Sequence, residues 1–456
     1  MLPKRSSSGD DRCRKEVARF LRRRLVWMQL GCLNALIALS ESTLDAQGQS
    51  NVSLERFVLA NGLTLIVHES RDLPLAHVRM FYHVAEKDAG PGQAGHAHLF
   101  EHLASSRTEH LDRSIWNFLE EIGASDYDAN SQYDFTHYYA TVPVAALDTV
   151  FWMEAQRMVH LASALTEEDL ERSRREVFDE EERLLQLPAV RILKETWDHT
   201  YPVGHPYAGF NIASEDVNQA TLLDARRFYE RYYHPANAVL VVVGDVDPAS
   251  VRSSVEGGFG SMTSGSSRTR SDPIVAERGE TQRRRVDGLV RVTQLRLVWN
   301  TPGWGTAAAD YLELATTILA RRIGSRMEGT QLSAEVNGGT EMRELGGQVM
   351  LDVIASPTAF REIEQIIRED IGRLASEGPT RAELDLAVDE YRDRLHQDAA
   401  ELGGLALLLG IGELLWENPG HFEVMLKRAE RATTENVRAA ADAWLAAGPV
   451  VLEFTP

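Results

Sequence analysis

The order in which apolar and polar positions recur along the chain predicts two units of similar make-up. Short apolar runs with strand-forming residues occupy 57–59 and 63–68 in the first half and 292–299 in the second half. The last of these runs is followed by a stretch at 307–321 whose residues favour a helix. Strands and helices therefore mix in both halves, which indicates an α+β protein.

Both halves also close in the same way. The first half ends with a predicted helix at 222–233 and a strand at 238–243, and the second ends with a helix at 434–445 and a strand at 450–454. A polar stretch rich in Ser and Gly begins at residue 261 and reads as an interdomain linker. A chain of 456 residues is too long for one ordinary core. We therefore expect a duplicated unit in two domains.

The overall negative charge limits the kinds of molecule that the chain is expected to bind. The chain has a formal net charge of −20, which argues against nucleic acid, because phosphates require a basic surface. A hydrophobic content of 43% and a charged content of 25% are typical of a soluble globular protein. Composition therefore leaves the function itself open.

The N-terminal residues depart from this acidic character. Residues 1–24 carry nine basic and three acidic residues, and an apolar run of fifteen residues follows at 25–39. This run is short for a membrane-spanning helix, which needs about 20 residues. We interpret residues 1–46 as an export signal, in preference to a buried helix or a membrane anchor, and expect a periplasmic or secreted protein. The cleavage position stays open.

The two cysteines, Cys13 and Cys32, both lie in this leader. The sequence Gln-Leu-Gly before Cys32 suggests lipoprotein anchoring, but the preceding apolar run is too brief to favour it. A mature chain that begins near residue 47 contains no thiol. That composition suits an oxidising compartment and suits the cytosol equally well.

The densest chemical signal is the segment from Gly95 to Leu103, which contains His98, Glu101 and His102 in the order H-x-x-E-H. On a helix, residues four apart share a face, so the two imidazoles can hold one metal ion. Glu101 then lies close enough to take a proton from a metal-bound water. Considered alone, the motif is equally compatible with two surface histidines that flank a solvated glutamate.

A third ligand is expected from a second helix. Residues 165–185 lack Gly and Pro and begin with a capping-box pattern at Thr166 and Asp169. Three consecutive carboxylates, Glu180, Glu181 and Glu182, lie near the end of this helix. Helical phase does not choose among them, because each is three or four residues from an apolar neighbour.

Further motifs give the chain a family resemblance. They occur in a fixed order over about residues 54 to 250, around Gly62–Val67, Asp134–Tyr139, Val142–Pro143, His205–Tyr207 and Tyr232–Val246. With the H-x-x-E-H segment, this order resembles the pitrilysin/insulinase-type (M16) zinc metallopeptidases, in particular their single-unit bacterial members. The resemblance implies two homologous α/β-sandwich domains that face each other across a cleft. It places a catalytic zinc domain at 47–260, a linker at 261–278 and a second domain without metal at 279–456.

The resemblance also implies a site. Zn²⁺ is expected on His98, His102 and Glu180, with Glu181 as the rival third ligand, and Glu101 is expected to serve as the base. The expected activity is hydrolysis of peptides or small unfolded proteins by a zinc-activated water. His96 is expected to have no direct role at the metal, because its helical direction points away from the metal face. His110, His137 and His205 are expected to form hydrogen bonds or to pack, and Trp152, Met153 and Met158 to belong to the core.

The chain departs from the family pattern at two places. The family's Asn-Ala or Asn-Gly on the substrate-binding edge strand is Asp128 and Ala129 here, unless that role passes to Asn130. The family's Arg and Tyr, seven residues apart in the second domain, have no counterpart in 325–337, which lacks Tyr and where Arg326 does not restore the pair.

The absence of the Arg and Tyr pair affects which partner subunit we expect. We expect a heterodimer with a related subunit that lacks the zinc motif and carries the Arg and Tyr, with a homodimer as the alternative. A non-catalytic peptide-binding or scaffold subunit is the alternative function, although such members generally lose part of H-x-x-E-H. A cytosolic housekeeping peptidase is a third option, and it requires the leader to be something other than a signal.

Overall fold

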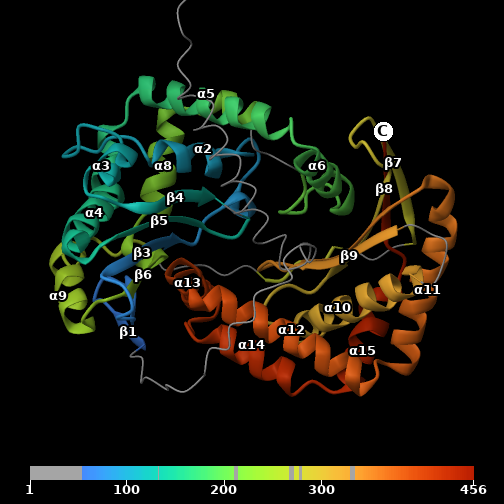
Figure 1. The fold of residues 1–456 in the computed structure, drawn as a ribbon. Helices are drawn as coiled ribbons and strands as arrows, with labels where there is room; N and C mark the ends of the chain where they lie inside the picture. Colours follow the sequence, from blue (N-terminus) through green and yellow to red (C-terminus); the bar gives the residue numbers. More distant parts are fainter. Residues whose placement is uncertain (1–53, 132, 210–213, 267–271, 277–279, 329–333) are drawn as a thin grey trace, which may run out of the picture.

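The computed structural model describes residues 54–131, 133–209, 214–266, 272–276, 280–328 and 334–456 (Figure 1). Two mixed sheets form the two halves of the molecule, with most of the first half at the upper left and most of the second at the lower right of this view. The leader at 1–46, with Cys13 and Cys32, lies outside the described residues, as does part of the linker at 261–278. The domain boundaries stay a prediction, and the described strands of the two sheets fall on either side of that linker.

The first sheet has six strands in the order β1-β2-β6-β3-β5-β4. Strands β2 and β6 run parallel, and the remaining neighbours are antiparallel. Its strands are β1 (Leu54–Val58), β2 (Thr64–Glu69), β3 (Leu75–Tyr82), β4 (Ser125–Ser131), β5 (Thr136–Pro143) and β6 (Ala238–Gly244). Strand β4 forms one edge of this sheet, so it has a neighbour on one side only.

The second sheet repeats this topology. Its order is β7-β11-β8-β10-β9, with β7 and β11 parallel and the other pairs antiparallel. Its strands are β7 (Gln282–Asp287), β8 (Gln294–Thr301), β9 (Ala334–Glu341), β10 (Gly347–Ala355) and β11 (Val450–Thr455). Strand for strand this matches β2-β6-β3-β5-β4, and β1 is the addition in the first half. The predicted duplication of an α+β unit is therefore confirmed.

Helices cover both sheets. Those of the first half are α2 (His96–Leu103), α3 (Ile115–Glu121), α4 (Leu147–Ala164), α5 (Glu167–Leu184), α6 (Pro188–Thr200), α7 (Glu215–Gln219), α8 (Leu222–Tyr232) and α9 (Pro248–Phe259). Those of the second half are α10 (Ala307–Glu328), α11 (Phe360–Glu377), α12 (Arg381–Ala400), α13 (Leu402–Trp416), α14 (His421–Glu430) and α15 (Thr434–Leu445). Short 3-10 turns lie at Glu86–Asp88, Val144–Ala146, Pro235–Asn237 and Pro357–Ala359.

Helix α10 is longer than its sequence predicts. The sequence pattern predicts a helix that ends at Arg321, whereas α10 continues to Glu328. The reason is the spacing of Leu319, Ile323 and Met327, all buried and four residues apart, which extends the apolar face of the helix by two turns.

One helix of each half packs against the sheet of the other half. Leu409 and Leu414 of α13 pack on the first sheet against Phe81. Helix α13 approaches so closely that a Cβ at Gly410 would lie 2.0 Å from a ring carbon of Phe81. In return, Ile192 of α6 joins the cluster on the second sheet. The two domains are therefore tied together by packed helices as well as by the linker.

A short loop after β9 makes polar contacts between the domains. The guanidinium of Arg343 lies 3.7 Å from the ring centre of Tyr133 and 5.0 Å from that of Tyr207. The next residue, Glu344, donates its backbone N–H to Asp134 at 3.0 Å. Burial raises the pKa of Asp134 to about 6. Asp134 and Tyr207, two of the sequence landmarks, therefore serve the contact between the domains.

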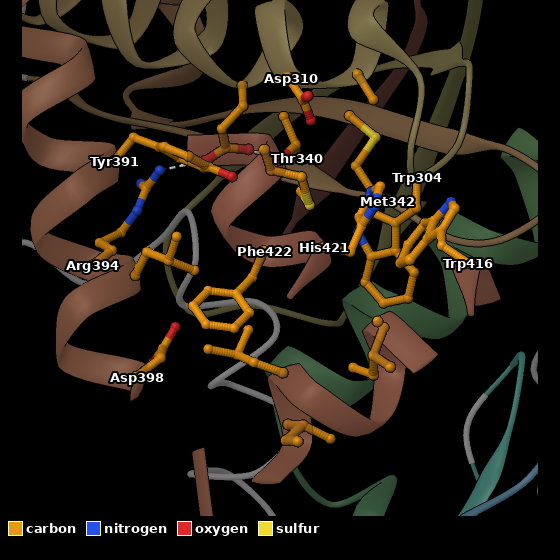
Figure 2. A pocket seen from close by; sticks show the side chains of 18 of the residues that line it. Trp304, Asp310, Thr340, Met342, Tyr391, Arg394, Asp398, Trp416, His421 and Phe422 are labelled. Carbon is orange, nitrogen blue, oxygen red and sulfur yellow. Dashed lines mark hydrogen bonds and ion pairs between the residues drawn. The ribbon is translucent and has the colours of Figure 1, made fainter. Parts of the chain in front are cut away.

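The second domain also contains a partly open, largely apolar pocket, which α13 helps to line. Figure 2 shows its aromatic side chains, among them Trp304, Trp416, His421 and Phe422, with Asp398 at the opposite end.

Among the described residues no single helix is long and apolar enough to cross a membrane; α12 and α13, bent by 108° at their junction, pass such a test only as a pair.

Candidate metal centre

Helix α2 begins where Gly95 adopts a left-handed conformation, with φ of 80°. Its residues Leu99, Phe100 and Leu103 are buried in the core of the first domain. The period of the helix then brings His98 and His102 together on another face, where their side chains are 14% and 20% exposed. The rings lie with their centres 4.8 Å apart. Two imidazoles are thus held side by side within reach of solvent.

Helix α5 supplies the neighbouring carboxylate. It begins with the predicted capping box, in which Thr166 and Asp169 bond each other's backbone N–H groups. Its buried residues include Val177 and Leu184, one face of the helix. Because Glu180 lies three residues after Val177, it projects from nearly the same side, where α5 packs against α2.

Three side-chain atoms converge between these helices. The Nε2 atoms of His98 and His102 are 3.3 Å apart, and one carboxylate oxygen of Glu180 lies 3.1 Å from His102 Nε2 and 3.7 Å from His98 Nε2. Together they form a group that could hold a metal ion. Glu180, one of the three consecutive carboxylates, is the member that joins the histidines.

The electrostatics of the group favour a cation. Burial by itself would lower the pKa of His102, but hydrogen bonds with Glu176 and Glu180 raise it to about 10. A positive charge is thus stabilised at the point where the imidazoles and the carboxylate meet. Two nitrogen donors and one oxygen donor are also a ligand set that zinc commonly takes in catalytic sites. The residues present fit a zinc ion.

Glu101 lies beside the group without belonging to it. Its side chain is buried, and burial raises its pKa to about 7. The backbone N–H of Ser131, at the end of β4, donates a hydrogen bond to its carboxyl group. Sequence reasoning did not find this role of Ser131, because any residue type can donate a backbone hydrogen bond. A carboxyl group with a pKa near neutrality is suited to accept and return a proton.

The three residues expected to contact substrate lie on β4, as predicted. Ala129 pairs with Tyr138 and is buried, while Asp128 and Asn130 flank it and are partly exposed. Since successive side chains of a strand alternate, Asp128 and Asn130 share the face opposite to that of Ala129. The outer edge of β4 has no strand neighbour in the described sheet.

Arg326 forms its ion pairs within the second domain. It binds Glu369 at 2.8 Å and Asp370 at 3.1 Å, both on α11 of the second domain. Residues 329–333 of the corresponding segment lie outside the described residues. These ion pairs hold Arg326 against α11, and its failure to restore the missing Arg and Tyr pair stays a prediction.

The other sequence predictions have mixed outcomes. His205 lies 3.0 Å from the backbone oxygen of Ile274, so it forms a hydrogen bond as expected. His96 lies 3.0 Å from the backbone oxygen of Asp216 and is not part of the group formed by His98, His102 and Glu180. The prediction that Trp152 is a core residue is wrong, because 39% of it is exposed. Its neighbour Met153 takes the buried position, since the side chains of adjacent helical residues point about 100° apart.

Comparisons with known proteins agree with the geometry. Two family models match successive parts of the chain, described as "Insulinase (Peptidase family M16)" over residues 70–204 and "Peptidase M16 inactive domain" over residues 219–391. The first of these ranges contains the candidate metal-binding group, and the second contains most of the second sheet.

Individual relatives extend over most of the chain. An uncharacterized zinc protease of Streptomyces coelicolor is 25% identical over 85% of this chain and 86% of its own length. The crystal structure of a protease from Helicobacter pylori has a TM-score of 0.78 at 18% identity and covers 89% of this chain and 100% of its own. A peptidase M16 inactive domain from Pseudomonas fluorescens has a TM-score of 0.77 at 18% identity, with 89% and 98% covered. These structures show that the fold is shared.

Proposed function

The chain belongs to the peptidase M16 (insulinase) family, and from that premise we propose that it is a zinc-dependent endopeptidase. The observation that carries the proposal is the meeting of His98, His102 and Glu180 beside the buried carboxyl group of Glu101. Its substrates are peptides or small unfolded proteins. Several relatives are named zinc proteases, which supports the choice of metal.

Each residue of the group has a distinct part in the proposed reaction. His98, His102 and Glu180 would hold the zinc ion, which would supply Lewis acidity toward a water molecule and the scissile carbonyl group. Glu101 would accept a proton from the attacking water and return it to the leaving amine. The hydrogen bond from the Ser131 N–H helps to orient the carboxylate of Glu101 and favours its charged form.

The substrate would bind along β4. An extended peptide can add to the outer edge of this strand by main-chain hydrogen bonds, which do not depend on side chains. Asp128 would then add a negative charge near the peptide, where the family has Asn. We expect this charge to favour basic residues in the substrate.

A non-catalytic scaffold subunit is the alternative function. The match of residues 219–391 to a domain described as inactive does not favour it, because the metal-binding group lies in the other half of the chain. The first domain retains the three candidate zinc ligands and the candidate base, which supports a catalytic role.

Digestion of a peptide library tests the function. Zinc-loaded protein should cleave peptides, protein stripped with a chelator should not, and addition of zinc should restore cleavage, because the water is activated only on the metal. Mass spectrometry of the products measures cleavage and its residue preference. Equal cleavage by stripped and zinc-loaded protein would exclude the mechanism.

A second proposal concerns the assembly. We propose that the chain acts with a related subunit that lacks the zinc motif and supplies the missing Arg and Tyr, because a transition state needs oxyanion-side donors. Coexpression with such a relative should raise kcat by roughly 10²-fold or more, the usual contribution of one such donor. Mass in solution and peptide hydrolysis are the measurements. Full activity of the chain alone, as a monomer or homodimer, would refute the heterodimer.

Export remains a proposal that rests on the leader. Residues 1–46 would direct the chain to the periplasm or the outside of the cell, and a mature chain that starts near residue 47 would contain no cysteine.

A further inference from the structure

A second group of metal-ligand type lies away from the candidate centre. It consists of Glu109, His110 and His160, each of which offers one ligand atom within 4.8 Å of the others. Glu109 and His110 occupy the turn that follows α2, and His160 lies near the end of α4. The Nδ1 atom of His160 is 3.1 Å from a carboxylate oxygen of Glu109. Two separate segments therefore bring these side chains together.

The backbone around the group is held in place. Thr108 and Leu111 close the turn by two reciprocal backbone hydrogen bonds of 3.0 and 3.3 Å. The N–H of Glu109 donates to the carbonyl of His160 at 3.4 Å, which fixes the turn against α4. The hydroxyl of Ser163, one turn after His160, has two acceptors within reach, the backbone oxygen of His160 at 3.2 Å and a carboxylate oxygen of Glu109 at 3.5 Å. Such outer hydrogen bonds orient the ligands of metal sites.

The arrangement parallels the candidate catalytic centre in composition and spacing. The rings of His110 and His160 have their centres 4.7 Å apart at 61°, compared with 4.8 Å at 86° for His98 and His102. Both groups combine two imidazoles with one carboxylate. That donor set suits zinc and similar late first-row divalent cations.

We propose that Glu109, His110 and His160 form a second metal site, which takes Zn²⁺ or a similar late first-row divalent cation from solution. Glu109 and His110 are exposed, so the ion can enter directly and complete its coordination with water. A bound ion would tie the turn after the helix of His98 and His102 to α4. The site stands apart from the proposed peptidase reaction and does not depend on it.

The test isolates the second site in the full chain. In the double variant His98→Ala, His102→Ala, equilibrium dialysis at micromolar free zinc should still find one zinc per chain. Added His110→Ala or His160→Ala should abolish this binding. Co²⁺ as a probe should give the visible absorption of a low-coordinate site in the double variant and lose it when His110 is replaced. If the double variant folds poorly, the same comparison is made in the wild type, with two zinc ions expected and one after His110→Ala.

Two further variants separate a built site from an ordinary ion pair. His199 is also paired with a carboxylate, Glu195, at 3.3 Å, but belongs to neither group of metal-ligand type among the described residues. His199→Ala should therefore leave the zinc content unchanged. Ser163→Ala should weaken zinc at the second site by about tenfold, as expected for a residue that orients a ligand.

Three outcomes would overturn the proposal. The first is a zinc content that does not change on replacement of His110 or His160. The second is binding only at millimolar zinc, which would mean an adventitious ion only. The third is an equal loss of zinc with His199→Ala, which would mean nonspecific binding by exposed histidines.

Discussion

Replacement of Glu101 by Gln should lower kcat for peptide hydrolysis by roughly 10²- to 10⁴-fold, the range expected for loss of a general base. The amide has nearly the shape of the carboxyl group, so the pocket beside Ser131 should stay filled. Because Glu101 is not among the converging ligands, the variant should keep its zinc. Hydrolysis of a peptide identified from the library and zinc content by mass spectrometry are the two measurements.

A matched control is Glu182→Gln, an exposed glutamate on α5 that has no assigned role. It should hydrolyse peptides at the wild-type rate. Normal turnover by Glu101→Gln, with zinc bound, would show that another group is the base. Loss of zinc in that variant would instead show that Glu101 is a ligand.

In zinc-free protein, Glu101→Gln should change how the free energy of unfolding depends on pH. Burial raises the pKa of Glu101 to about 7 in the folded protein, above its ordinary value of 4.5. The folded chain therefore holds this proton more tightly than the unfolded chain does, and the resulting stability is lost as the pH rises from about 4.5 through 7. Urea unfolding should show a smaller loss over this range in Glu101→Gln.

Replacement of Glu180 by Ala should weaken zinc binding at the centre of His98 and His102 by more than about 100-fold. Loss of an indirect partner of a metal ligand already costs 10- to 100-fold in affinity, and Glu180 is proposed as a direct ligand. Hydrolysis should fall in parallel at limiting zinc. The measurements are a competition titration with a zinc chelator and the peptide assay.

The neighbouring variant Glu181→Ala serves as the comparison. Glu181 is the rival from the sequence, and it is not part of the group that converges on the histidines. It should therefore retain zinc with wild-type affinity. The reverse pattern, with zinc kept in Glu180→Ala and lost in Glu181→Ala, would move the third ligand by one residue.

Local geometry explains why so much of the first domain's site was predictable. His98 and His102 are four residues apart, and a helix of any orientation places such residues on one face. The capping box at Thr166 likewise needs only the backbone N–H groups of its own turn. The closing helices and strands of both halves follow from periodicity in the same way, and α15 ends at the predicted residues, Thr434 and Leu445.

The tertiary structure decided what depends on distances between elements. Helical phase left Glu180, Glu181 and Glu182 equivalent, and the choice of Glu180 came from how the apolar face of α5 packs beside α2. The raised pKa of Glu101 depends on burial of its carboxyl group, which the packing of separate elements produces. The meeting of His110 with His160 joins residues 50 positions apart, which no local pattern predicts. Backbone periodicity fixes which residues share a face, but only the packing of those faces fixes which faces meet.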